Sequence, residues 1–499
     1  ARESARRISI SGWYPDCNPS AEVYSRFDPW GAFLSGQNGL LMWMTMPMFV
    51  YVSSSNGINP QGRLTNYWKQ TLEEAFLIRN RYFKLLDGME RPRQKKIALY
   101  YSRPSEIVSH FYVPDYLWKK QVAMGLFAAR QWDTLLSSSG VERHFIADAQ
   151  VLDGLLRSPG RPEVVILPAI TALSDLEVEE LRDFVRTGGV LVADVLPGAH
   201  DENGTLRRNP ALAELFGVSV PERPALKESK TTLRLPNATG AAMLTVTTLA
   251  NPEAWPSVEG LGENLFLSRK YGAGRTYLTN CLLPDYRNKL ARAGRNVPAK
   301  LFLQHYLGSS GIFADVPGLE NAGPVKNIEL ATFADTNGAE YVGVLKNARY
   351  AEVTPEAFNL EFKTRRHLYN CRSGEYLGFG NRIEGTVDGA HTQLYALLPY
   401  RVTGIEVTGL EQARAGTLME LELAVQVKDE ARIGRHAVDL QIFDVAGREL
   451  VELRRGVALP GGRGRAVLPL AVNMHGEFTL RITDSATGTV AEKKFTIAF

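Results

Sequence analysis

The chain reads Glu163-Val164-Val165-Ile166-Leu167-Pro168 at the first of two short apolar runs and Gly188-Gly189-Val190-Leu191-Val192-Ala193-Asp194 at the second. Continuous aliphatic runs of this length are typical of strands that are buried on both faces of a parallel sheet. Between them, Ser174-Asp175-Leu176-Glu177 forms a capping box, which predicts a helix that runs to about Thr187. Strand, helix and strand in this order predict a doubly wound α/β sheet.

The same pattern continues on both sides of these runs. Upstream, Ile97–Tyr101 and His144–Asp148 predict two further strands, and Tyr116–Ser137 predicts a helix between them. Downstream, residues 272–279 predict a last strand, and Gly272-Ala273-Gly274 is typical of a hairpin turn. We therefore expect this α/β domain to occupy residues 93–310.

Residues 1–92 contain a second α/β pattern. Arg7–Trp13 and Leu40–Met44 predict strands, and Asn66–Asp87 predicts a long helix. Asp28 and Pro29 suit the N-cap and first position of a shorter helix that ends near Gly36. Two strand–helix units cannot bury a core alone, so this segment needs partners that it does not itself supply.

The chain changes character after about Gly311. Alternating β-branched and aromatic residues are separated by turn signals such as Thr336-Asn337-Gly338. This pattern predicts two β-sandwiches, over residues 311–402 and 403–499, the second of which resembles an immunoglobulin-like module. The clearest expected strands are Glu340–Leu345, Asn359–Phe362, Gln393–Leu398, Leu418–Val427, Ala437–Asp444 and Gly476–Asp484.

Composition excludes several classes of function. The net charge is only +3 and no long basic run occurs, so we expect no nucleic-acid partner. No apolar run is long enough to span a bilayer, so we expect no membrane partner. Cys17, Cys281 and Cys371 have no metal or redox spacing, and the eight histidines lack helical ligand spacing, so we expect no metal or other cofactor. The compartment stays open, either cytoplasmic or exported.

Aromatic residues follow both strands predicted in residues 1–92. Trp43 ends the second of these strands, and Trp13 and Tyr14 end the first. In a (β/α)₈ barrel, functional residues lie at the C-terminal ends of the strands, where an aromatic ring can stack on a sugar. The alternative is a core tryptophan under a loop. We predict Trp43, Trp13 and Tyr14 as sugar-contacting residues.

The acidic residues of the same segment do not form a recognisable catalytic pair. Hydrolysis of a glycosidic bond needs two carboxyl groups at a controlled separation. The acids near the two predicted strands are Glu3, Asp16, Glu22 and Asp28, and none is a glutamate at a strand end. Asp16 suits a turn. The catalytic residues are therefore left unassigned.

An acyl-transfer site in the α/β domain is also excluded. A glutamine amidotransferase-like domain would carry a nucleophilic cysteine in the turn after Val164–Leu167. That turn reads Pro168-Ala169-Ile170 and has no thiol.

These stretches together resemble the β-galactosidase-like glycoside hydrolases, family 42 and its relatives. Residues 30–43 are similar to the last barrel unit of that group. Residues 97–102 and 164–192 resemble its amidotransferase-like domain, which lacks the catalytic cysteine in many members, and residues 395–402 resemble the end of the following β-domain. The resemblance implies that residues 1–92 are the C-terminal part of a (β/α)₈ barrel.

The resemblance also implies an activity and an assembly. It implies a hydrolase of β-galactosides or related oligosaccharides and a homotrimer formed through the amidotransferase-like domain. The family's acid/base glutamate would lie upstream of Ala1, and Arg7–Trp13 offers no nucleophilic glutamate. We therefore expect a truncated chain that is inactive alone, as part of an active longer enzyme. The alternative is a non-catalytic carbohydrate-binding or scaffolding protein derived from the same family.

Overall fold

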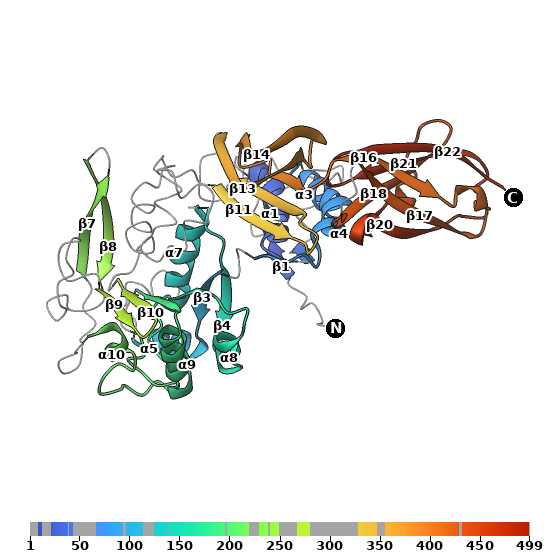
Figure 1. Ribbon diagram of the computed structural model, residues 1–499. Helices are drawn as coiled ribbons and strands as arrows, with labels where there is room; N and C mark the ends of the chain where they lie inside the picture. The colour runs from blue at the N-terminus through green and yellow to red at the C-terminus, as the bar shows by residue number, and fades with distance from the viewer. Residues whose placement is uncertain are drawn as a thin grey trace, which may run out of the picture. The chain divides into compact units, whose positions relative to one another are not determined.

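The computed structural model divides the chain into two compact units (Figure 1). The first unit combines Ala1–Arg91 with Leu330–Phe499, and the second is Pro92–Glu329. The structure describes residues 8–11, 21–37, 39–42, 66–92, 96–112, 124–138, 140–194, 197–218, 229–237, 240–248, 267–279, 328–346, 355–428 and 432–498.

The second unit is built on a six-stranded sheet with the order β4-β3-β5-β6-β10-β9. From β3, the chain adds β4 on one side and β5 and β6 on the other, all parallel, and β9 closes the edge in antiparallel pairing with β10. Parallel strands on both sides of β3 form the doubly wound sheet that the sequence predicts. The strands are β3 (Ile97–Tyr101), β4 (His144–Ala147), β5 (Val164–Leu167), β6 (Val190–Ala193), β9 (Leu267–Tyr271) and β10 (Gly274–Leu278).

Helices cover both faces of this sheet. All residues of β5 and β6 are buried, as the two apolar runs predict. Alternate strand residues such as Tyr100, Leu167 and Leu191 join Leu181 and Phe184 of α9 in one core cluster. The helices are α5 (Arg103–Tyr112), α7 (Met124–Ser138), α8 (Asp148–Leu152), α9 (Asp175–Arg186) and α10 (Ala213–Phe216). Helices α5 and α7 contact each other, and so do α8 and α9.

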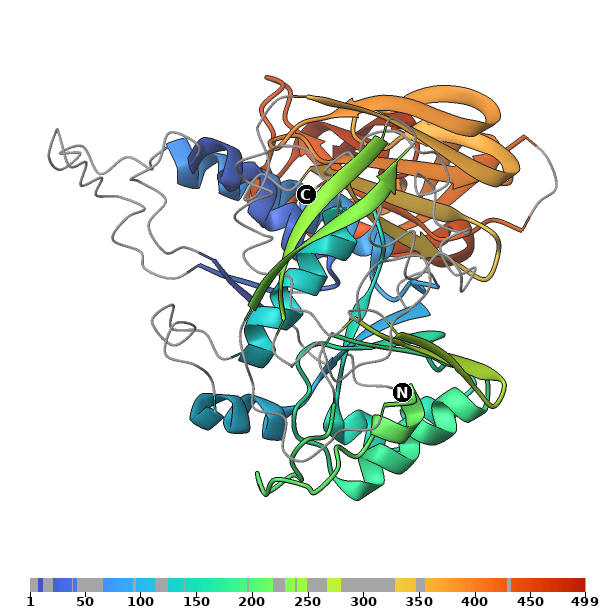
Figure 2. The same ribbon diagram turned by 90° about the vertical axis from the view of Figure 1, so that its left-hand side faces the viewer.

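Local signals placed some of these elements and missed others. The capping box is confirmed, because the Ser174 hydroxyl accepts from the Glu177 N–H and the Glu177 carboxylate accepts from the Ser174 N–H at 2.7 Å. The predicted hairpin turn is also confirmed between β9 and β10. Helix α5 was not predicted. Of the helix predicted over 116–137, residues 124–137 are helical and the preceding ones lie outside the described residues. Figure 2 shows one further element, the long two-stranded ribbon of β7 (Ser229–Asn237) and β8 (Gly240–Thr248).

The first unit begins with a β–α–β unit of β1 (Ile8–Ser11), α1 (Ala21–Leu34) and β2 (Gly39–Met42). The sequence wrongly predicted that a helix starts at Asp28, because Pro29 lies inside α1. An internal proline costs about 3 kcal/mol. However, Phe27, Trp30 and Leu34 are all buried in one core cluster. Burying side chains on both sides of Pro29 against the same partners requires a continuous helix, so tertiary packing outweighs the local preference.

The long helix predicted over Asn66–Asp87 is confirmed, with an irregular middle. It consists of α3 (Asn66–Leu77), the π-helical turn η2 (Ile78–Tyr82) and α4 (Phe83–Leu86). Gly88 follows with a φ of 77°, the left-handed conformation expected after a helix end. A π-turn inserts one residue into a helix, and here it lies where Tyr82 is fully buried against the β-domain.

A five-stranded sheet with the order β11-β12-β15-β13-β14 packs on these helices. A sandwich was predicted over residues 311–402, whereas the described residues of that span form this single sheet. Its apolar side chains, including Tyr341 and Leu394, share a core cluster with Trp30 and Tyr82, so helices supply the second layer. The strands are β11 (Ile328–Ala334), β12 (Glu340–Lys346), β13 (Glu356–Asn370), β14 (Glu375–Val387) and β15 (Gln393–Leu398).

The last residues form the predicted sandwich of two antiparallel sheets, β16-β17-β20 and β19-β18-β21-β22. Three buried polar side chains lie at the start of this sandwich. The His436 ring forms hydrogen bonds with the Asp484 carboxylate at 3.0 Å and with the Tyr400 hydroxyl at 3.0 Å. The strands are β16 (Val402–Thr408), β17 (Leu418–Val427), β18 (His436–Phe443), β19 (Arg455–Leu459), β20 (Arg463–Pro469), β21 (Gly476–Asp484) and β22 (Val490–Ile497).

Candidate functional site

The C-terminal ends of β1 and β2 form the first candidate site. The two strands pair in parallel, and the register runs from Ile8 opposite Gly39 to Ser11 opposite Met42. Both strands therefore end at the same level, at the edge where (β/α)₈ enzymes carry their functional residues. Trp43 follows Met42 directly in the sequence. Trp13, Tyr14 and Trp43 lie outside the described residues, so their role in sugar contact stays a prediction.

A buried carboxylate anchors the helices behind this edge. Glu74 of α3 is 3% exposed and accepts hydrogen bonds from the Trp30 indole N–H at 2.7 Å and from the Arg26 guanidinium at 3.0 Å. Arg372, in the turn between β13 and β14, donates to both Glu74 oxygens at 3.2 Å and lies 5.0 Å from the centre of the Trp30 ring.

This cluster joins three parts of the first unit. Glu74 connects α3 to α1 through Trp30 and to the five-stranded sheet through Arg372. Both of its oxygens already accept hydrogen bonds from donors, two of which are cationic, so it suits a positioning role and not proton transfer. Sequence reasoning missed the cluster because its members are separated by 44 and 298 residues, and no local pattern connects them.

A strained turn follows β5 in the second unit. Ala169 has a φ of 48° and is the one non-glycine residue with positive φ in the described part of the chain. Its N–H donates to Asp194 at 2.6 Å, and the other Asp194 oxygen accepts from the Trp132 indole at 3.0 Å. A strained turn at a strand end is a geometry that presents nucleophiles. Here the turn carries a buried methyl group, so it offers no nucleophile.

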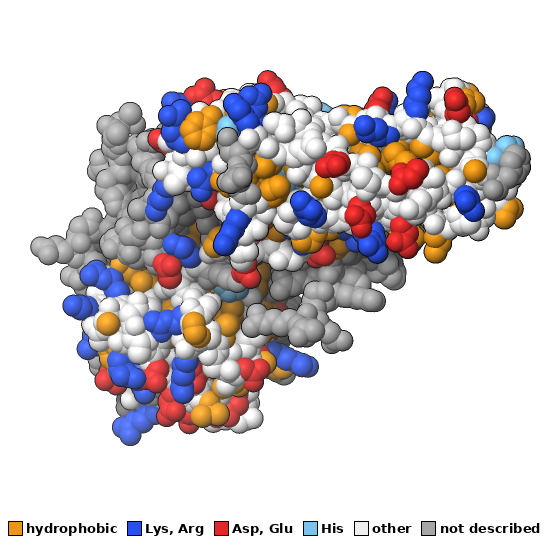
Figure 3. Space-filling model, turned by 45° about the vertical axis from the view of Figure 1, so that its right-hand side comes forward, with side chains coloured by type: hydrophobic (Ala, Val, Ile, Leu, Met, Phe, Trp, Pro, Cys, Tyr) orange, Lys and Arg blue, Asp and Glu red, His pale blue; other side chains and the backbone are white. Residues whose placement is uncertain are grey.

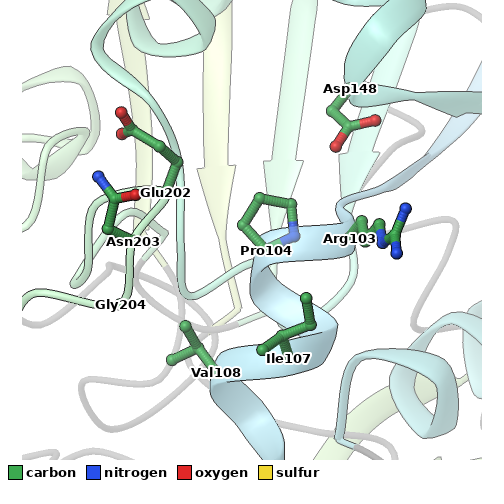
Figure 4. Close-up of a pocket in the computed structure, with 8 residues that line it drawn as sticks. All are labelled: Arg103, Pro104, Ile107, Val108, Asp148, Glu202, Asn203 and Gly204. Carbon is green, nitrogen blue, oxygen red and sulfur yellow. The ribbon is translucent and has the colours of Figure 1, made fainter.

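A pocket of about 440 Å³ opens beyond β3 and β4 of the same unit (Figure 4). Its walls come from the starts of α5 and α8 and from the loop after β6, a position where open α/β sheets bind ligands. The polar lining consists of Arg103, Asp148, Glu202 and Asn203, and the apolar lining includes Pro104, Ile107 and Val108. The mixture of one cation, two acids and an amide suits a small polar molecule. The sequence did not predict this pocket because three separate segments build it.

The described residues offer little support for a metal site or a nucleophilic cysteine. No group of three or more His, Cys, Asp or Glu side chains among them is arranged to hold a metal ion. Burial raises the pKa of the Cys371 thiol well above its usual range, which makes this cysteine a poor nucleophile. None of the described helices is long and apolar enough to cross a membrane.

Comparisons with known proteins agree with this architecture. Residues 127–293 match the family model described as the β-galactosidase trimerisation domain of glycoside hydrolase family 42. No curated protein matches the sequence.

Two solved structures are similar to the fold. The β-galactosidase from Bacillus circulans sp. alkalophilus matches with 14% identity and a TM-score of 0.50, over 79% of this chain and 55% of that one. Gan42B, a family 42 β-galactosidase from G. stearothermophilus, matches with 14% identity and a TM-score of 0.51, over 75% of this chain and 50% of that one. The chain thus spans about half the length of these two structures. The resemblance to family 42 inferred from the sequence is confirmed.

Proposed function

We propose that this chain is part of a β-galactosidase-like glycoside hydrolase that acts on β-galactosides or related oligosaccharides. The observation that carries the proposal is the β1–α1–β2 unit, in which two parallel strands end at the same level. Aromatic residues follow each end within three positions: Trp13 and Tyr14 after Ser11, and Trp43 after Met42. The trimerisation-domain match and the similarity to family 42 structures support it further.

In this proposal, residues near the β1–β2 edge form one wall of a sugar site. Trp43 stacks on the apolar face of a sugar ring, and Trp13 and Tyr14 line the site beside it. Aromatic rings suit this role because they combine a large apolar face with polar groups at the edge.

The reaction in the proposed enzyme is a double displacement. One carboxyl group protonates the leaving oxygen while a second, about 5–5.5 Å away, attacks the sugar. We assign no such pair within these residues: the family's acid/base glutamate would lie upstream of Ala1, and the buried Glu74 is already engaged by Trp30, Arg26 and Arg372. We therefore expect the 499-residue chain alone not to hydrolyse a nitrophenyl-β-galactoside.

The proposed assembly is a homotrimer formed through the second unit, as the description of its family model suggests. A closed trimer repeats one head-to-tail interface three times. Size-exclusion chromatography with light scattering should give three times the chain mass of 55.3 kDa. A monomer at all concentrations would contradict this assembly.

The sugar site is tested by binding. Titration calorimetry with a β-galacto-oligosaccharide should give an affinity that falls about tenfold or more in Trp43→Ala, because stacking area is lost. Phe76→Ala is the control, since Phe76 is an exposed aromatic residue of α3 in the same unit. Equal affinity of the wild type and both variants would contradict the proposed wall.

A non-catalytic carbohydrate-binding or scaffolding protein remains the alternative. It would keep the binding that depends on Trp43. Hydrolysis should then be absent when the chain is produced with whatever coding sequence precedes Ala1. Turnover that appears with such a longer chain favours the enzyme.

A further inference from the structure

The β13–β14 pair exposes a cluster of aromatic and cationic side chains, which we call the aromatic–arginine face. Its members are Arg365, His367, Tyr376 and Phe379 of the pair and Arg401 just before β16, and they lie beside the buried ring of Tyr369. At the upper left of Figure 3, Lys and Arg side chains stand beside hydrophobic ones in the part of the first unit that holds these strands. The function proposed above does not use this cluster.

A β-bulge brings its rings to one side of the sheet. His367 and Tyr369 are two residues apart in β13 and therefore point to the same face. Their partners in β14 are Phe379 and Tyr376, which are three residues apart. In a regular strand, two residues that are three positions apart would point to opposite faces. The register shift after Leu368 inserts one extra residue in β14, and all four rings then share a face.

Contacts within the cluster hold its exposed rings in place. The Phe379 ring lies 4.9 Å from the His367 ring and 5.0 Å from the Arg365 guanidinium. Tyr376 lies 4.9 Å from the Arg401 guanidinium, and its hydroxyl is 2.8 Å from Nδ1 of His367. Phe379 is nevertheless 50% exposed and Tyr376 37% exposed. Exposed rings that are already fixed lose little conformational entropy when a ligand binds.

Among the described residues, the two arginines at the cluster also have no acidic partner. No carboxylate in the described part of the chain forms an ion pair with Arg365 or Arg401. By contrast, neighbouring Arg372 pairs with Glu74, and Arg382 pairs with Glu384 at 2.6 Å. A planar guanidinium beside an exposed ring is suited to a carboxylate or sulfate, which it can bind through two parallel hydrogen bonds.

We propose that the aromatic–arginine face binds an anionic saccharide chain. Sugar rings pack on Phe379 and Tyr376, and carboxylate or sulfate substituents pair with Arg365 and Arg401. A track for nucleic acid would need more phosphate-neutralising cations along one path. The choice of a saccharide over single-stranded RNA rests on the proposed function.

Affinity electrophoresis of the full 499-residue chain tests this proposal, with polygalacturonate as the acidic probe and neutral β-galactan as the comparison. We expect polygalacturonate to retard the chain. The double variant Arg365→Gln/Arg401→Gln should weaken this binding about tenfold, and added salt should weaken it in the wild type because the pairs are exposed. Phe379→Ala should weaken it as well.

Matched controls separate this surface from general charge. Arg465→Gln removes an exposed arginine of β20, and Leu418→Ala removes an exposed apolar side chain of β17. Both should bind polygalacturonate like the wild type. Binding that is absent in the wild type, or lost equally in these controls, overturns the proposal. Tighter binding to polyuridylate than to polygalacturonate also overturns it.

The two proposals fail separately. Trp43→Ala should weaken binding of neutral galactosides and leave polygalacturonate binding unchanged. The double arginine variant should weaken binding of polygalacturonate and leave binding of neutral galactosides unchanged. If only the arginine variant has an effect, the proposed sugar wall at β1–β2 is wrong and the aromatic–arginine face stands. If only Trp43→Ala has an effect, the proposal for the aromatic–arginine face is wrong.

Discussion

Replacing Glu74 with glutamine should destabilise the first unit without greatly changing its shape. The glutamine amide keeps one oxygen that can accept from the Trp30 indole. Its NH₂ group, however, is a donor and meets the donors of Arg26 or Arg372, which lie within 3.0 and 3.2 Å of the present carboxylate. The variant therefore loses charge-assisted hydrogen bonds and leaves two guanidinium groups without their shared anion.

The contacts set the expected magnitude. A hydrogen bond to a charged group contributes about 1.5–3 kcal/mol, and breaking a fully buried pair costs about 3–5 kcal/mol. Arg26 and Arg372 are partly exposed, so water recovers some of this loss. We expect Glu74→Gln to lower the free energy of unfolding of the first unit by about 2–4 kcal/mol.

Urea titration combined with hydrogen–deuterium exchange can measure this loss unit by unit. Exchange should accelerate in α1, α3 and the β13–β14 turn, and the second unit should be unaffected. Glu73→Gln is the matched control: Glu73 is 50% exposed and lies 3.8 Å from the same Arg26, so its loss should stay below about 1 kcal/mol. A double-mutant cycle with Arg372→Gln should give a coupling of about 1–3 kcal/mol. If Glu74→Gln costs no more than Glu73→Gln, the anchoring role is refuted.

Three further predictions concern stability. Gly274→Ala should destabilise the second unit by about 3 kcal/mol or more in urea titration, because the added Cβ would lie 2.2 Å from two backbone carbonyl oxygens. Gly160→Ala is the control: its Cβ would meet nothing within 4 Å, so it should change the free energy of unfolding by less than about 0.5 kcal/mol. Burial raises the pKa of Asp484, but the His436 ring and other hydrogen-bond donors lower it by more than burial raises it. The pKa of Asp484 therefore lies below its ordinary value. The stability that ionised Asp484 contributes should be complete above about pH 4 and lost as the pH falls through the lower folded-state pKa. The urea midpoint of Asp484→Asn should therefore fall less steeply in acid than that of the wild type, and an equally steep fall would contradict this. Ser174→Ala should cost about 1 kcal/mol in the second unit through loss of the helix cap, and an unchanged midpoint would refute that role.

The sequence predicted the elements whose signals are local. Residues 164–167 and 190–193 form buried strands, because continuous aliphatic runs need cover on both faces. The capping box located the start of α9, and the paired glycines at 272 and 274 located the β9–β10 turn. Sequence reasoning failed where distant packing overrides local preference, as at Pro29 inside α1.

The candidate sites divide in the same way. Aromatic residues after two predicted strands were visible in the sequence, and the structure added that these strands pair in parallel and end level. The pocket beyond β3 and β4 and the cluster around Glu74 could not be predicted, since their members are far apart in the chain. The bulge in β14 was invisible as well, because it exists only in the register with β13.

Sequence therefore established the class of this protein: a parallel α/β domain with no thiol in the turn after Val164–Leu167, β-domains after it, and a resemblance to family 42. These conclusions depend on residue type and short spacings, which hydrophobic burial and backbone geometry convert directly into helices, strands and turns. The folded chain established which surfaces act together. Glu74 meets Arg372, and Phe379 lies beside His367, through contacts between separate elements. Such contacts depend on packing and strand register across long loops, and short-range patterns carry no information about them.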